Sequence, residues 1–457
     1  MKSRTRYSFV VVCLAGLLAV PAQAAEWQDL INESGLDGWE QVGGNARYEC
    51  EGGEVVGYAV ANSPNSFLST KKHYSDFILE YETRLDAPMN SGMQIRSHVG
   101  NKGVVQGYQV EVDPTYRRFS GGLYDEKRRK WLYPLTRNEK ARDAFRNGDW
   151  NHFRVEAIGN SLRVWVNGVQ TVDMVDDMMA KGFFGLQVHS ITDPEHAGRS
   201  VRWRNMRILT DDLEANRMPR DPEVVQISYL QNELTDYQVR NGWRLLWDGK
   251  TSAGWRGAKL DRFPESGWTM KDGILTVEAT DGGESTGPGD IVTTDSFSNF
   301  ELQFEFLITK GANSGVKYFV DPSLNKGTGS AIGCEFQIID DAVHPDTNAG
   351  VSGNRTLGSL YDLITAENLQ TKGRAKQFKG IGLWNQGRII SHNGHVEHWL
   401  NNEKVVEFDR FSQMFRALVA YSKYKVWPGF CQWPDGQLLL QDHGDTVSYR
   451  NIKVREW

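Results

Sequence analysis

The first half of the chain contains a strand-like segment that alternates polar residues with valines, Gln109-Val110-Glu111-Val112-Asp113. In an extended strand every second side chain lies on the same face, so Gln109, Glu111 and Asp113 point together. Amide and acidic residues are uncommon in strands, and acids that share a face repel one another. We therefore predict that Glu111 and Asp113 transfer protons and that Gln109 binds a polar ligand. A solvated sheet face is the alternative.

The second half contains a related segment, residues 335–341, that reads Glu-Phe-Gln-Ile-Ile-Asp-Asp. Glu335 and Gln337 share a face here, so the carboxylate and the amide have exchanged places relative to the first half. We predict proton transfer by Glu335 and Asp340, and ligand binding by Gln337.

The acidic end of this segment also offers ligands for a metal. Asp340, Asp341 and His344 lie close together in the sequence, and hard carboxylate oxygens suit a divalent cation such as Ca²⁺. An acidic loop without a metal is the alternative, so the sequence leaves the cofactor open.

Each half also carries a Gln-x-His triplet, Gln187 to His189 and Gln441 to His443. An imidazole titrates near neutral pH and can act as a general acid or base. A lone histidine is more often structural, but its recurrence in both halves favours a chemical role. We predict proton transfer by His189 and His443, and ligand binding by Gln187 and Gln441.

Aromatic and cationic residues near these strands complete the candidate set. Ring faces stack on the C–H faces of sugars, and a guanidinium can polarise a carbonyl group. Filling of the core is the alternative for each ring. The predicted ligand-binding residues of this kind are Arg96, Tyr124, Trp165, Tyr361 and Trp399.

The matching segments belong to a long internal repeat. Residues 76–82 and 299–305 are similar, and each is followed by Asn-Ser-Gly, at 90–92 and 313–315. We predict two homologous modules, residues 25–211 and 241–457. The linker between them, residues 212–240, has no counterpart in the repeat and is expected to hold a short helix or an extended piece. The repeat also predicts an extra hairpin in the second module, around residues 414–435.

Within each module the hydrophobic residues recur with a period of two. Phe77, Leu79 and Tyr81 alternate with Ile78, Glu80 and Glu82, and glycine-containing turns follow at short intervals. This pattern is typical of half-buried antiparallel strands. The sequence therefore predicts an all-β protein made of two tandem β-sandwiches of the jelly-roll type.

The first 24 residues have the pattern of a secretory signal peptide. Basic residues precede an apolar run from Phe9 to Val20, and Ala22-Gln23-Ala24 forms a cleavage site. The run is too short to span a bilayer, so we expect a periplasmic or secreted protein without a membrane span. The chain has 58 acidic and 52 basic residues, a balance that disfavours nucleic acid as a partner. Outside the leader, Cys334 and Cys431 are the expected disulfide pair, because both lie in the second module, and Cys50 remains.

Several ordered motifs resemble one known family. The second module reads Gly-Trp-Arg-Leu-Leu-Trp-Asp-Gly-Lys at 242–250, Gly-Ala-Asn-Ser-Gly-Val at 311–316 and Leu-Gln-Asp-His-Gly at 440–444. It resembles the 3-keto-disaccharide hydrolase domain family, which has a concanavalin A-like jelly-roll fold. The first module resembles another branch of that family through residues 107–113, 148–151 and 185–189. One departure is Asn401-Asn402, which stands where the family usually has Asn-Gly.

The resemblance implies an enzyme that cleaves 3-keto-glycosides or 3-keto-disaccharides. Base-assisted elimination followed by hydration gives net hydrolysis, and Arg96 or a bound cation would stabilise the enolate. A sugar 3-dehydrogenase is the implied functional partner, because it supplies the oxidised sugar. The alternative is a non-catalytic, lectin-like protein with two carbohydrate-binding modules, since one fold serves many functions.

Overall fold

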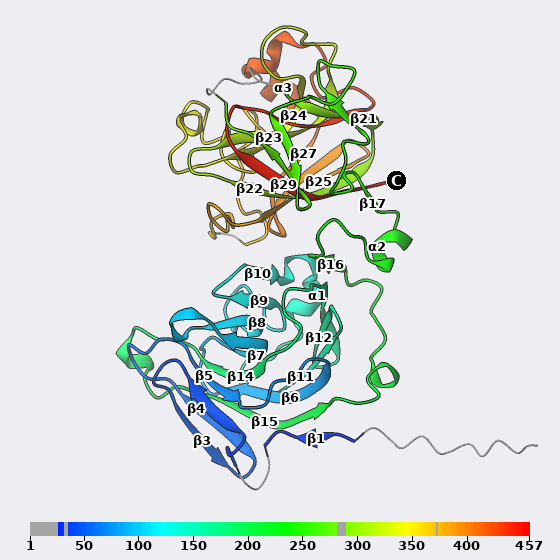
Figure 1. Ribbon diagram of the computed structural model, residues 1–457. Coiled ribbons are helices and arrows are strands. Elements are labelled where there is room, and N and C mark those ends of the chain that lie inside the picture. Colours follow the sequence, from blue (N-terminus) through cyan, green and yellow to red (C-terminus); the bar gives the residue numbers. More distant parts are fainter. Residues whose placement is uncertain (1–25, 32–34, 281–288, 372) are drawn as a thin grey trace, which may run out of the picture.

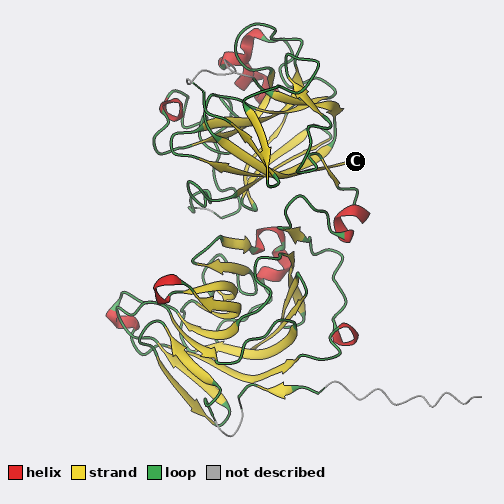
Figure 2. Cartoon of the chain, viewed as in Figure 1, coloured by secondary structure: helices red, strands yellow, loops and turns green. Residues whose placement is uncertain are grey.

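The computed structural model describes residues 26–31, 35–280, 289–371 and 373–457. The predicted leader, residues 1–24, lies outside these ranges. Strands are the main regular structure of the described chain, and the helices are few and short (Figure 2). The predicted all-β fold with two sandwiches is confirmed, because the strands form two pairs of mainly antiparallel sheets.

The first sandwich consists of a large sheet and a small sheet, seen in the lower half of Figure 1. The large sheet has the spatial order β16 (Ile227–Ser228), β13 (Val169–Val175), β12 (Ser161–Val166), β11 (Asn151–Ile158), β6 (Phe77–Leu85), β15 (Ser200–Leu209), β4 (Glu54–Tyr58) and β3 (Arg47–Glu51), with β1 (Gln28–Asp29) paired to β15. The small sheet has the order β10 (Lys130–Tyr133), β9 (Leu123–Glu126), β8 (Val105–Val112), β7 (Ser91–Val99), β14 (Phe183–Val188), β5 (Ser66–Thr70) and β2 (Trp39–Val42).

The second sandwich repeats this arrangement in the upper half of Figure 1. Its large sheet has the order β19 (Trp268–Lys271), β20 (Ile274–Val277), β29 (Val447–Glu456), β22 (Phe300–Ile308), β25 (Asn385–His392), β26 (His395–Leu400) and β27 (Glu403–Asp409), with β17 (Arg244–Leu245) paired to β29. Its small sheet has the order β18 (Trp255–Gly257), β21 (Ile291–Phe297), β28 (Gly436–Leu440), β23 (Asn313–Asp321) and β24 (Ile332–Ile339).

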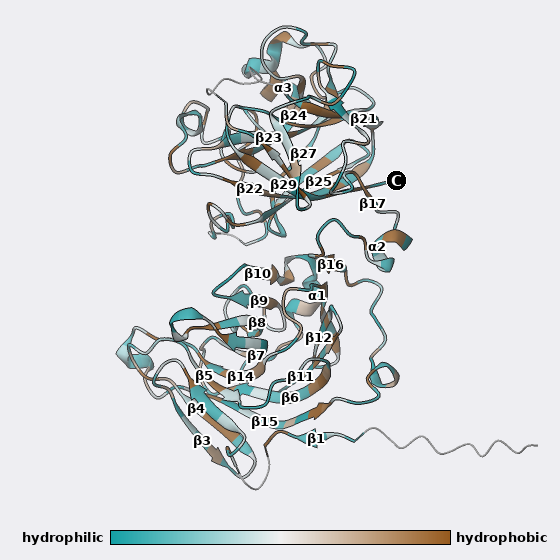
Figure 3. Cartoon of the chain, in the orientation of Figure 1, coloured by the Kyte–Doolittle hydropathy of each residue, from teal (hydrophilic) through white to brown (hydrophobic). Residues whose placement is uncertain are grey.

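The alternation of residue types along each strand places the core between the sheets (Figure 3). On β6, Phe77, Leu79 and Tyr81 belong to the first core, while Glu80 on the opposite face pairs with Arg154 and Arg207. On β8, Tyr108, Val110 and Val112 point into the same core. The residues between them therefore point to the other face of the small sheet, where a ligand can reach them.

The linker between the modules packs against the first sandwich and contains one short helix. β16 pairs in parallel with β13, and α2 spans Asp236–Arg240. Thr235 and Gln238 form a capping box at its start, which satisfies two backbone donors. α1 (Glu139–Arg142) lies in the first module, and short 3-10 turns span Asn101–Gly103, Leu135–Arg137, Pro194–His196, Glu214–Asn216, Pro345–Asn348 and Lys423–Val426.

The extra hairpin predicted around residues 414–435 is wrong, because this segment begins as a helix. α3 spans Gln413–Tyr421, and the Ser412 hydroxyl caps it by accepting a hydrogen bond from Phe415 N. Phe415 is buried and stacks on Phe408. A capping serine followed by one anchored aromatic residue thus outweighs the strand preference of the aromatics further along.

Two smaller features bear on the sequence-based expectations. The disulfide predicted between Cys334 and Cys431 is confirmed, and Cys50 is a free, half-buried cysteine. No helix within the described residues is long and apolar enough to span a lipid bilayer.

Candidate functional site

A polar cavity of about 460 Å³ lies over the small sheet of the first module. β8 supplies Gln109 and Glu111 to its wall, β9, β10 and β14 supply five further residues, and loops supply the rest. The full lining is Asn65, Asn90, Gln109, Glu111, Arg117, Tyr124, Glu126, Lys127, Lys130, Trp131, Gln187, His189, Arg374 and Gln377. The size and the convergence of polar groups are those of a site for a small polar molecule.

Glu111 is the most unusual group in this cavity. Its carboxylate is buried and accepts hydrogen bonds from Asn90 Nδ2 and, over 2.8 Å, from Gln109 Nε2. Burial raises the pKa of Glu111 to about 7; Asp113 adds to this effect, while the two amide donors and Arg117 oppose it. A carboxyl group with this pKa can take up and release a proton at neutral pH.

The amide donors to Glu111 are themselves held in place. Gln94 Nε2 donates to Gln109 Oε1 over 2.6 Å, and Ser97 Oγ donates to Gln94 Oε1 over 2.7 Å. Gln109 and Gln94 lie opposite each other on β8 and β7. This chain of side chains fixes the Gln109 amide with its nitrogen toward the carboxylate.

The repeated Asn-Ser-Gly motif is explained by this geometry. Asn90 donates to Glu111, and Ser91 Oγ donates to the Gln187 carbonyl on β14 over 2.7 Å. Gly92 lies between Glu111 and Gln187 in the sheet register. A Cβ atom at Gly92 would lie 2.7 Å from Gln109 Cγ, so only glycine leaves room for the glutamine side chain.

Gln187 and His189 form the opposite part of the cavity. Gln187 is almost fully buried, and neither its amide nitrogen nor its amide oxygen has a hydrogen-bond partner among the described residues. A buried amide without partners is costly, which indicates a ligand position. His189 Nδ1 lies 2.8 Å from the Ser190 carbonyl. Since a carbonyl only accepts, Nδ1 carries the proton and Nε2 is left as an acceptor.

Cations and further acids surround Gln187 and His189. Arg117 lines the cavity and pairs through Nε with Asp113 Oδ2 at 2.9 Å. Lys127 lies 3.6 Å from Glu126. Burial raises the pKa of Glu126, and Lys127 and His189 oppose that shift.

The prediction that Asp113 transfers protons needs correction, because its carboxylate does not line the cavity. Asp113 lies just past the end of β8, where its Oδ1 also accepts a hydrogen bond from Thr115 N. It holds the loop that carries Arg117, so its effect on the cavity is indirect.

Two aromatic rings form one wall of the cavity. Tyr124 and Trp131 meet edge to face with ring centroids 5.4 Å apart, and Trp131 meets Phe119 in the same way at 5.1 Å. Burial raises the pKa of Tyr124 to about 12, so its hydroxyl stays protonated and can donate a hydrogen bond. The wall offers an apolar ring surface next to polar donors, which is the combination that a sugar ring requires.

An adjoining cavity of about 430 Å³ shares Asn65, Glu126, Lys127 and His189 with the first. Its other walls are less polar and include Pro64, Phe67, Val104 and Val105. The two cavities therefore meet at His189. Together they offer space for a ligand with two parts.

The second module arranges the equivalent residues differently. Register places Gln337 opposite Gly315 and Glu335 opposite Lys317, as Glu111 lies opposite Gly92 and Gln109 opposite Gln94. Lys317 Nζ lies 3.7 Å from Glu335 Oε2, and both side chains are buried. With its nitrogen toward the carboxylate, the Gln337 amide donates to Glu335 Oε1 over 3.0 Å. The exchanged carboxylate is thus matched by a lysine in place of Gln94.

The triplet at 441–443 has the same backbone setting as its counterpart. Ser314 Oγ donates to the Gln441 carbonyl over 2.7 Å, as Ser91 does to Gln187. The His443 ring meets the His344 ring edge to face, with centroids 6.2 Å apart. Gln441 N donates to the Gly315 carbonyl, next to Glu335, and His443 has a histidine neighbour that His189 lacks in the described residues.

The other candidate residues of the second module make contacts that hold its loops in place. Asp340 accepts from Gly311 N and Ala342 N, and Asp341 accepts from Leu357 N and pairs with Lys376. His344 Nδ1 accepts from Asp346 N, and Tyr361 donates to Asp346 Oδ2. The predictions of a catalytic Asp340 and of a cation held by Asp340, Asp341 and His344 need correction, because backbone and lysine donors occupy these carboxylates.

Besides Gln337, Gln441 and Tyr361 of the second module, three further predicted ligand-binding residues lie outside the cavity. Arg96 is buried behind the small sheet, where it donates to the Ser75 and Gly159 carbonyls and pairs with Asp76 at 2.9 Å. Trp165 and Trp399 lie on the large sheets, on strands whose alternate residues enter the cores, and Trp399 packs under Arg388. The prediction for these three residues is corrected.

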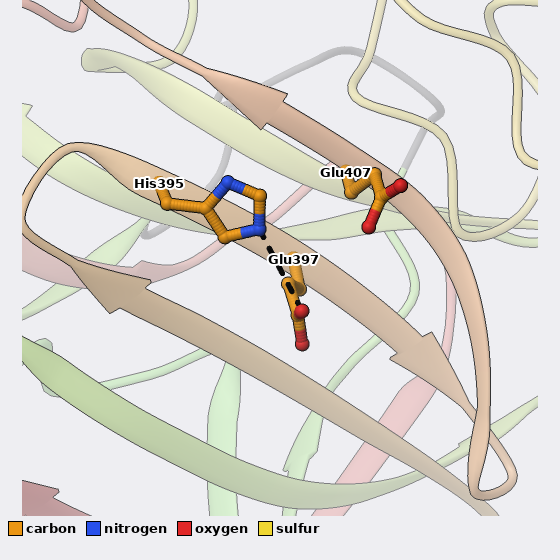
Figure 4. A group of neighbouring side chains, drawn as sticks. All are labelled: His395, Glu397 and Glu407. Atoms are coloured by element: carbon orange, nitrogen blue, oxygen red, sulfur yellow. Dashed lines mark ion pairs between the residues drawn. The ribbon is translucent and has the colours of Figure 1, made fainter.

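One further group of potential metal ligands occurs in the described residues, on the large sheet of the second module (Figure 4). His395 and Glu397 lie on β26, and Glu407 lies on β27. Lys404 Nζ lies 3.0 Å from Glu397 and 2.6 Å from Glu407. The lysine already neutralises these carboxylates, so we assign the group to surface ion pairing.

Several cavity residues have only weak signals in the sequence. Asn90 belongs to the repeated Asn-Ser-Gly motif, which could have identified it. Arg117, Lys127 and Lys130 lie in loops or at strand starts without any repeat, and Arg374 and Gln377 come from the other module. Only the three-dimensional fold brings these residues to Glu111.

The fold and the site define a protein with two tandem β-sandwiches and a sugar-sized polar cavity over one small sheet. A family model described as the 3-keto-alpha-glucoside-1,2-lyase-like domain matches the chain twice, over residues 26–209 and 242–455. The chain therefore belongs to this family and carries two copies of its domain. The resemblance inferred from the sequence motifs is confirmed.

Individual proteins are similar to part of this chain. A curated protein of Bacteroides thetaiotaomicron, named 3-keto-disaccharide hydrolase, is 35% identical over 235 residues, which are 47% of this chain and 78% of the relative. A crystal structure of a candidate glycosyl hydrolase from Parabacteroides distasonis is 28% identical and covers 50% of this chain and 99% of its own, with a TM-score of 0.43. A second such structure from the same organism is 24% identical and covers 47% and 99%, with a TM-score of 0.35.

Proposed function

We propose that the protein is an exported enzyme that cleaves 3-keto-glycosides or 3-keto-disaccharides by elimination followed by hydration. Glu111 carries the proposal. It is a buried carboxyl group with a pKa of about 7, it is held by amide donors, and it faces a cavity of sugar size. The family is named after a lyase and the curated relative is named a hydrolase. The two reactions differ by one step, because hydrolysis results when water is added after the elimination.

The first step uses Glu111 as a base. A ketone at C3 of the sugar acidifies the hydrogen on C2, and the ionised Glu111 takes that proton. The electron pair of the C2–H bond forms the enolate, whose negative charge falls on the C3 oxygen. Arg117 and the hydroxyl of Tyr124 line the same cavity and stabilise that charge.

The second step breaks the glycosidic bond. The enolate electrons form a C1–C2 double bond, and the C1–O bond pair leaves with the aglycone oxygen. That oxygen takes the proton held by Glu111, which restores the carboxylate. The products are an alcohol and an unsaturated ketone.

The third step adds water. His189 Nε2 accepts a proton from a water molecule while the water oxygen bonds to C1 and the electrons of the double bond return to the enolate. The enolate carbon C2 then takes this proton from His189, which restores the neutral imidazole. The sum of the three steps is one glycoside plus one water giving 3-keto-sugar plus alcohol. The adjoining cavity, which meets the first at His189, accommodates the leaving group.

The proposal includes a location and a partner reaction. The predicted leader, residues 1–24, supports export to the periplasm or beyond. A 3-keto-glycoside must come from oxidation of the C3 hydroxyl of a sugar, so the functional partner is a sugar 3-dehydrogenase.

The experiment gives purified protein 3-keto-trehalose or a 3-keto-glucoside and measures released 3-keto-glucose by chromatography. Wild type is expected to release it, and the double variant Glu111→Gln, Glu335→Gln is expected to be inactive. Equal release by both proteins would overturn the residue assignment. Binding of unoxidised oligosaccharides in calorimetry, with no turnover of any keto-sugar, would instead favour a lectin-like protein.

A further inference from the structure

The wall of the first module's cavity contains two residues from the second module. Arg374 and Gln377 lie in the loop between β24 and β25, and they line the cavity together with Glu111 and His189. In Figure 1 the upper module lies next to the β10 and β9 edge of the lower one. The cavity is therefore bounded on one side by the small sheet of the first module and on the other by a loop of the second module.

The two modules are held in this position by specific contacts. Lys130 Nζ donates to the Lys379 carbonyl over 2.9 Å, and Gln370 Nε2 donates to the Thr136 carbonyl over 2.8 Å. Thr136 Oγ1 donates to the Asn402 carbonyl over 2.7 Å. Asn402 is the residue that departs from the Asn-Gly pattern of the family, and it lies in this interface.

A buried charge cluster strengthens the same interface. Arg137 of the first module lies among Glu301, Arg388 and Arg455 of the second. Burial alone would raise the pKa of Glu301, but the three guanidinium groups lower it to about 2. The first module thus supplies one of the cations that neutralise a buried carboxylate of the second.

The loop that carries Arg374 is anchored to its own module. Asn401 Nδ2 donates to the Gln377 carbonyl over 2.5 Å, and Lys376 pairs with Asp341 at 2.7 Å. Arg374 Nη1 pairs with Glu403, which is almost fully buried. Among the described residues, this is the only hydrogen bond that the Arg374 guanidinium makes, although the group has five N–H donors.

Arg117 of the first module and Arg374 of the second module are held at the cavity in the same way. Each lines the cavity, and each is held from behind by a buried carboxylate of its own module, Asp113 or Glu403. Both guanidinium groups also lie over the Phe119 ring, with 5.8 Å from each Cζ to the centroid. Bringing two like charges to one cavity is unfavourable unless an anionic group lies between them.

We propose that Arg374, supplied by the second module, completes the first module's site by binding the C3 oxygen of the keto-sugar as it becomes an enolate, together with Arg117. This inference rests on the proposed function and adds to it a specific role for the second module. It also makes the two modules a single catalytic unit. The second module acts on the first module's substrate independently of any function of its own small sheet.

The test uses full-length protein and compares Arg374→Ala with Arg416→Ala on a 3-keto-glucoside. Arg416 is a matched control, because it is an exposed arginine of the second module on α3. Arg374→Ala is expected to lower kcat about 100-fold, the effect of losing one oxyanion donor. Arg416→Ala is expected to keep wild-type kcat. Arg416→Ala should keep the wild-type Tm, whereas Arg374→Ala leaves the buried Glu403 without its cation and should have a lower Tm, so kcat is compared at a temperature at which both variants are folded. Arg374→Lys should retain an intermediate kcat.

A structural role is separated from a catalytic one by chemical rescue. Low concentrations of ethylguanidine are expected to restore part of the kcat of Arg374→Ala and to leave Arg416→Ala unchanged. Failure of rescue in folded Arg374→Ala protein would overturn the proposal, because it would mean that Arg374 only holds the loop.

A double-variant comparison identifies which site Arg374 serves. Added to Glu335→Gln, Arg374→Ala should again cost about 100-fold; added to Glu111→Gln, it should cost little more, because both residues then act on one transition state. The reverse pattern would assign Arg374 to the second module. A wild type that turns over no 3-keto-glycoside would overturn the proposed function. An active wild type with an unimpaired Arg374→Ala variant would overturn only this inference.

Discussion

The small sheets of the two modules share the order of five strands and the Asn-Ser-Gly motif, but one carboxylate has different partners in each. Within the described part of the chain Glu111 receives hydrogen bonds from amide donors alone and faces the cavity, whereas Glu335 pairs with the buried Lys317, whose ammonium also donates to Ser330. When Glu335 takes a proton, the Lys317 charge loses its counter-ion in the interior, which is costly. The comparison shows that moving an acid by two residues and adding one lysine turns a carboxyl group held by amides into part of an ion pair.

The surroundings of the two carboxylates have diverged in the same direction. The second module ties β24 to the segment after α3 through the Cys334–Cys431 disulfide, and Tyr424 and Trp427 cover a smaller cavity of about 240 Å³ near Lys317. The first module keeps a larger opening, and the second module's loop closes part of it. We therefore expect catalysis at Glu111 and a supporting role for the second module.

The largest expected effect comes from the two glutamates. Glu111→Gln should lower kcat on a 3-keto-glucoside by about 10³-fold, because it removes the general base. Glu335→Gln should change kcat by less than about threefold. Steady-state kinetics on the two single variants measures this difference, and equal losses would mean that the two sheets are equivalent.

The next effect is on stability and sharpens the contrast between Lys317 and Gln94. Lys317→Ala leaves a buried carboxylate without its cation and should cost about 3–5 kcal/mol. Gln94→Ala, at the equivalent position, leaves only a neutral amide and a hydroxyl and should cost about 1–3 kcal/mol. Urea unfolding of both variants provides the values; a milder loss for Lys317→Ala would contradict the ion-pair account.

The disulfide gives a comparable effect confined to one module. Cys334→Ser should lower the free energy of unfolding by about 2–5 kcal/mol, because the bridge constrains a long loop in the unfolded chain. Cys50→Ser is the control and should change it by no more than about 0.5 kcal/mol. A reducing agent should reproduce the first result in wild type, and insensitivity to reduction would show that the bridge does not contribute.

The smallest effect is the pH dependence of Glu111. The base must be ionised, so kcat/KM should fall about tenfold per pH unit below pH 7 and level off above it, following the pKa of about 7. Burial raises this pKa above 4.5, so the folded state holds the proton more tightly than the unfolded state. Wild type therefore loses stability as pH rises from 4.5 to 7. Glu111→Gln lacks this loss and should gain Tm relative to wild type above pH 7; a pH-independent difference would contradict the assignment.

The sequence predicted the parts of the site that follow from strand alternation. Gln109 and Glu111 lie on β8, Gln187 lies on β14 and His189 directly follows it; their spacing of two and their recurrence in both modules indicated them. Antiparallel pairing through β7 then brings them to one cavity. Arg96 escaped this reasoning because β7 has an irregular register after Ile95, and Arg96 adopts a φ of 46°. Alternation counted across such a bulge assigns the wrong face.

The rest of the site depends on contacts that no local pattern encodes. Arg117 lies in a loop whose position depends on Asp113, and Arg374 reaches the cavity only because the modules pack through Lys130, Thr136 and Asn402. The departure at Asn402 was visible in the sequence. Its place in the interface between the modules could be identified only from the structure.

The most direct test of the account is hydrogen exchange at C2 of the sugar. Wild type is given a 3-keto-glucoside in D₂O, and the released 3-keto-glucose is analysed by mass spectrometry and NMR at early times. Elimination and hydration through Glu111 predict one deuterium at C2 for wild type and for Glu335→Gln, and neither release nor exchange for Glu111→Gln. Release of 3-keto-glucose that keeps its original C2 hydrogen, or unimpaired exchange by Glu111→Gln, would contradict the account.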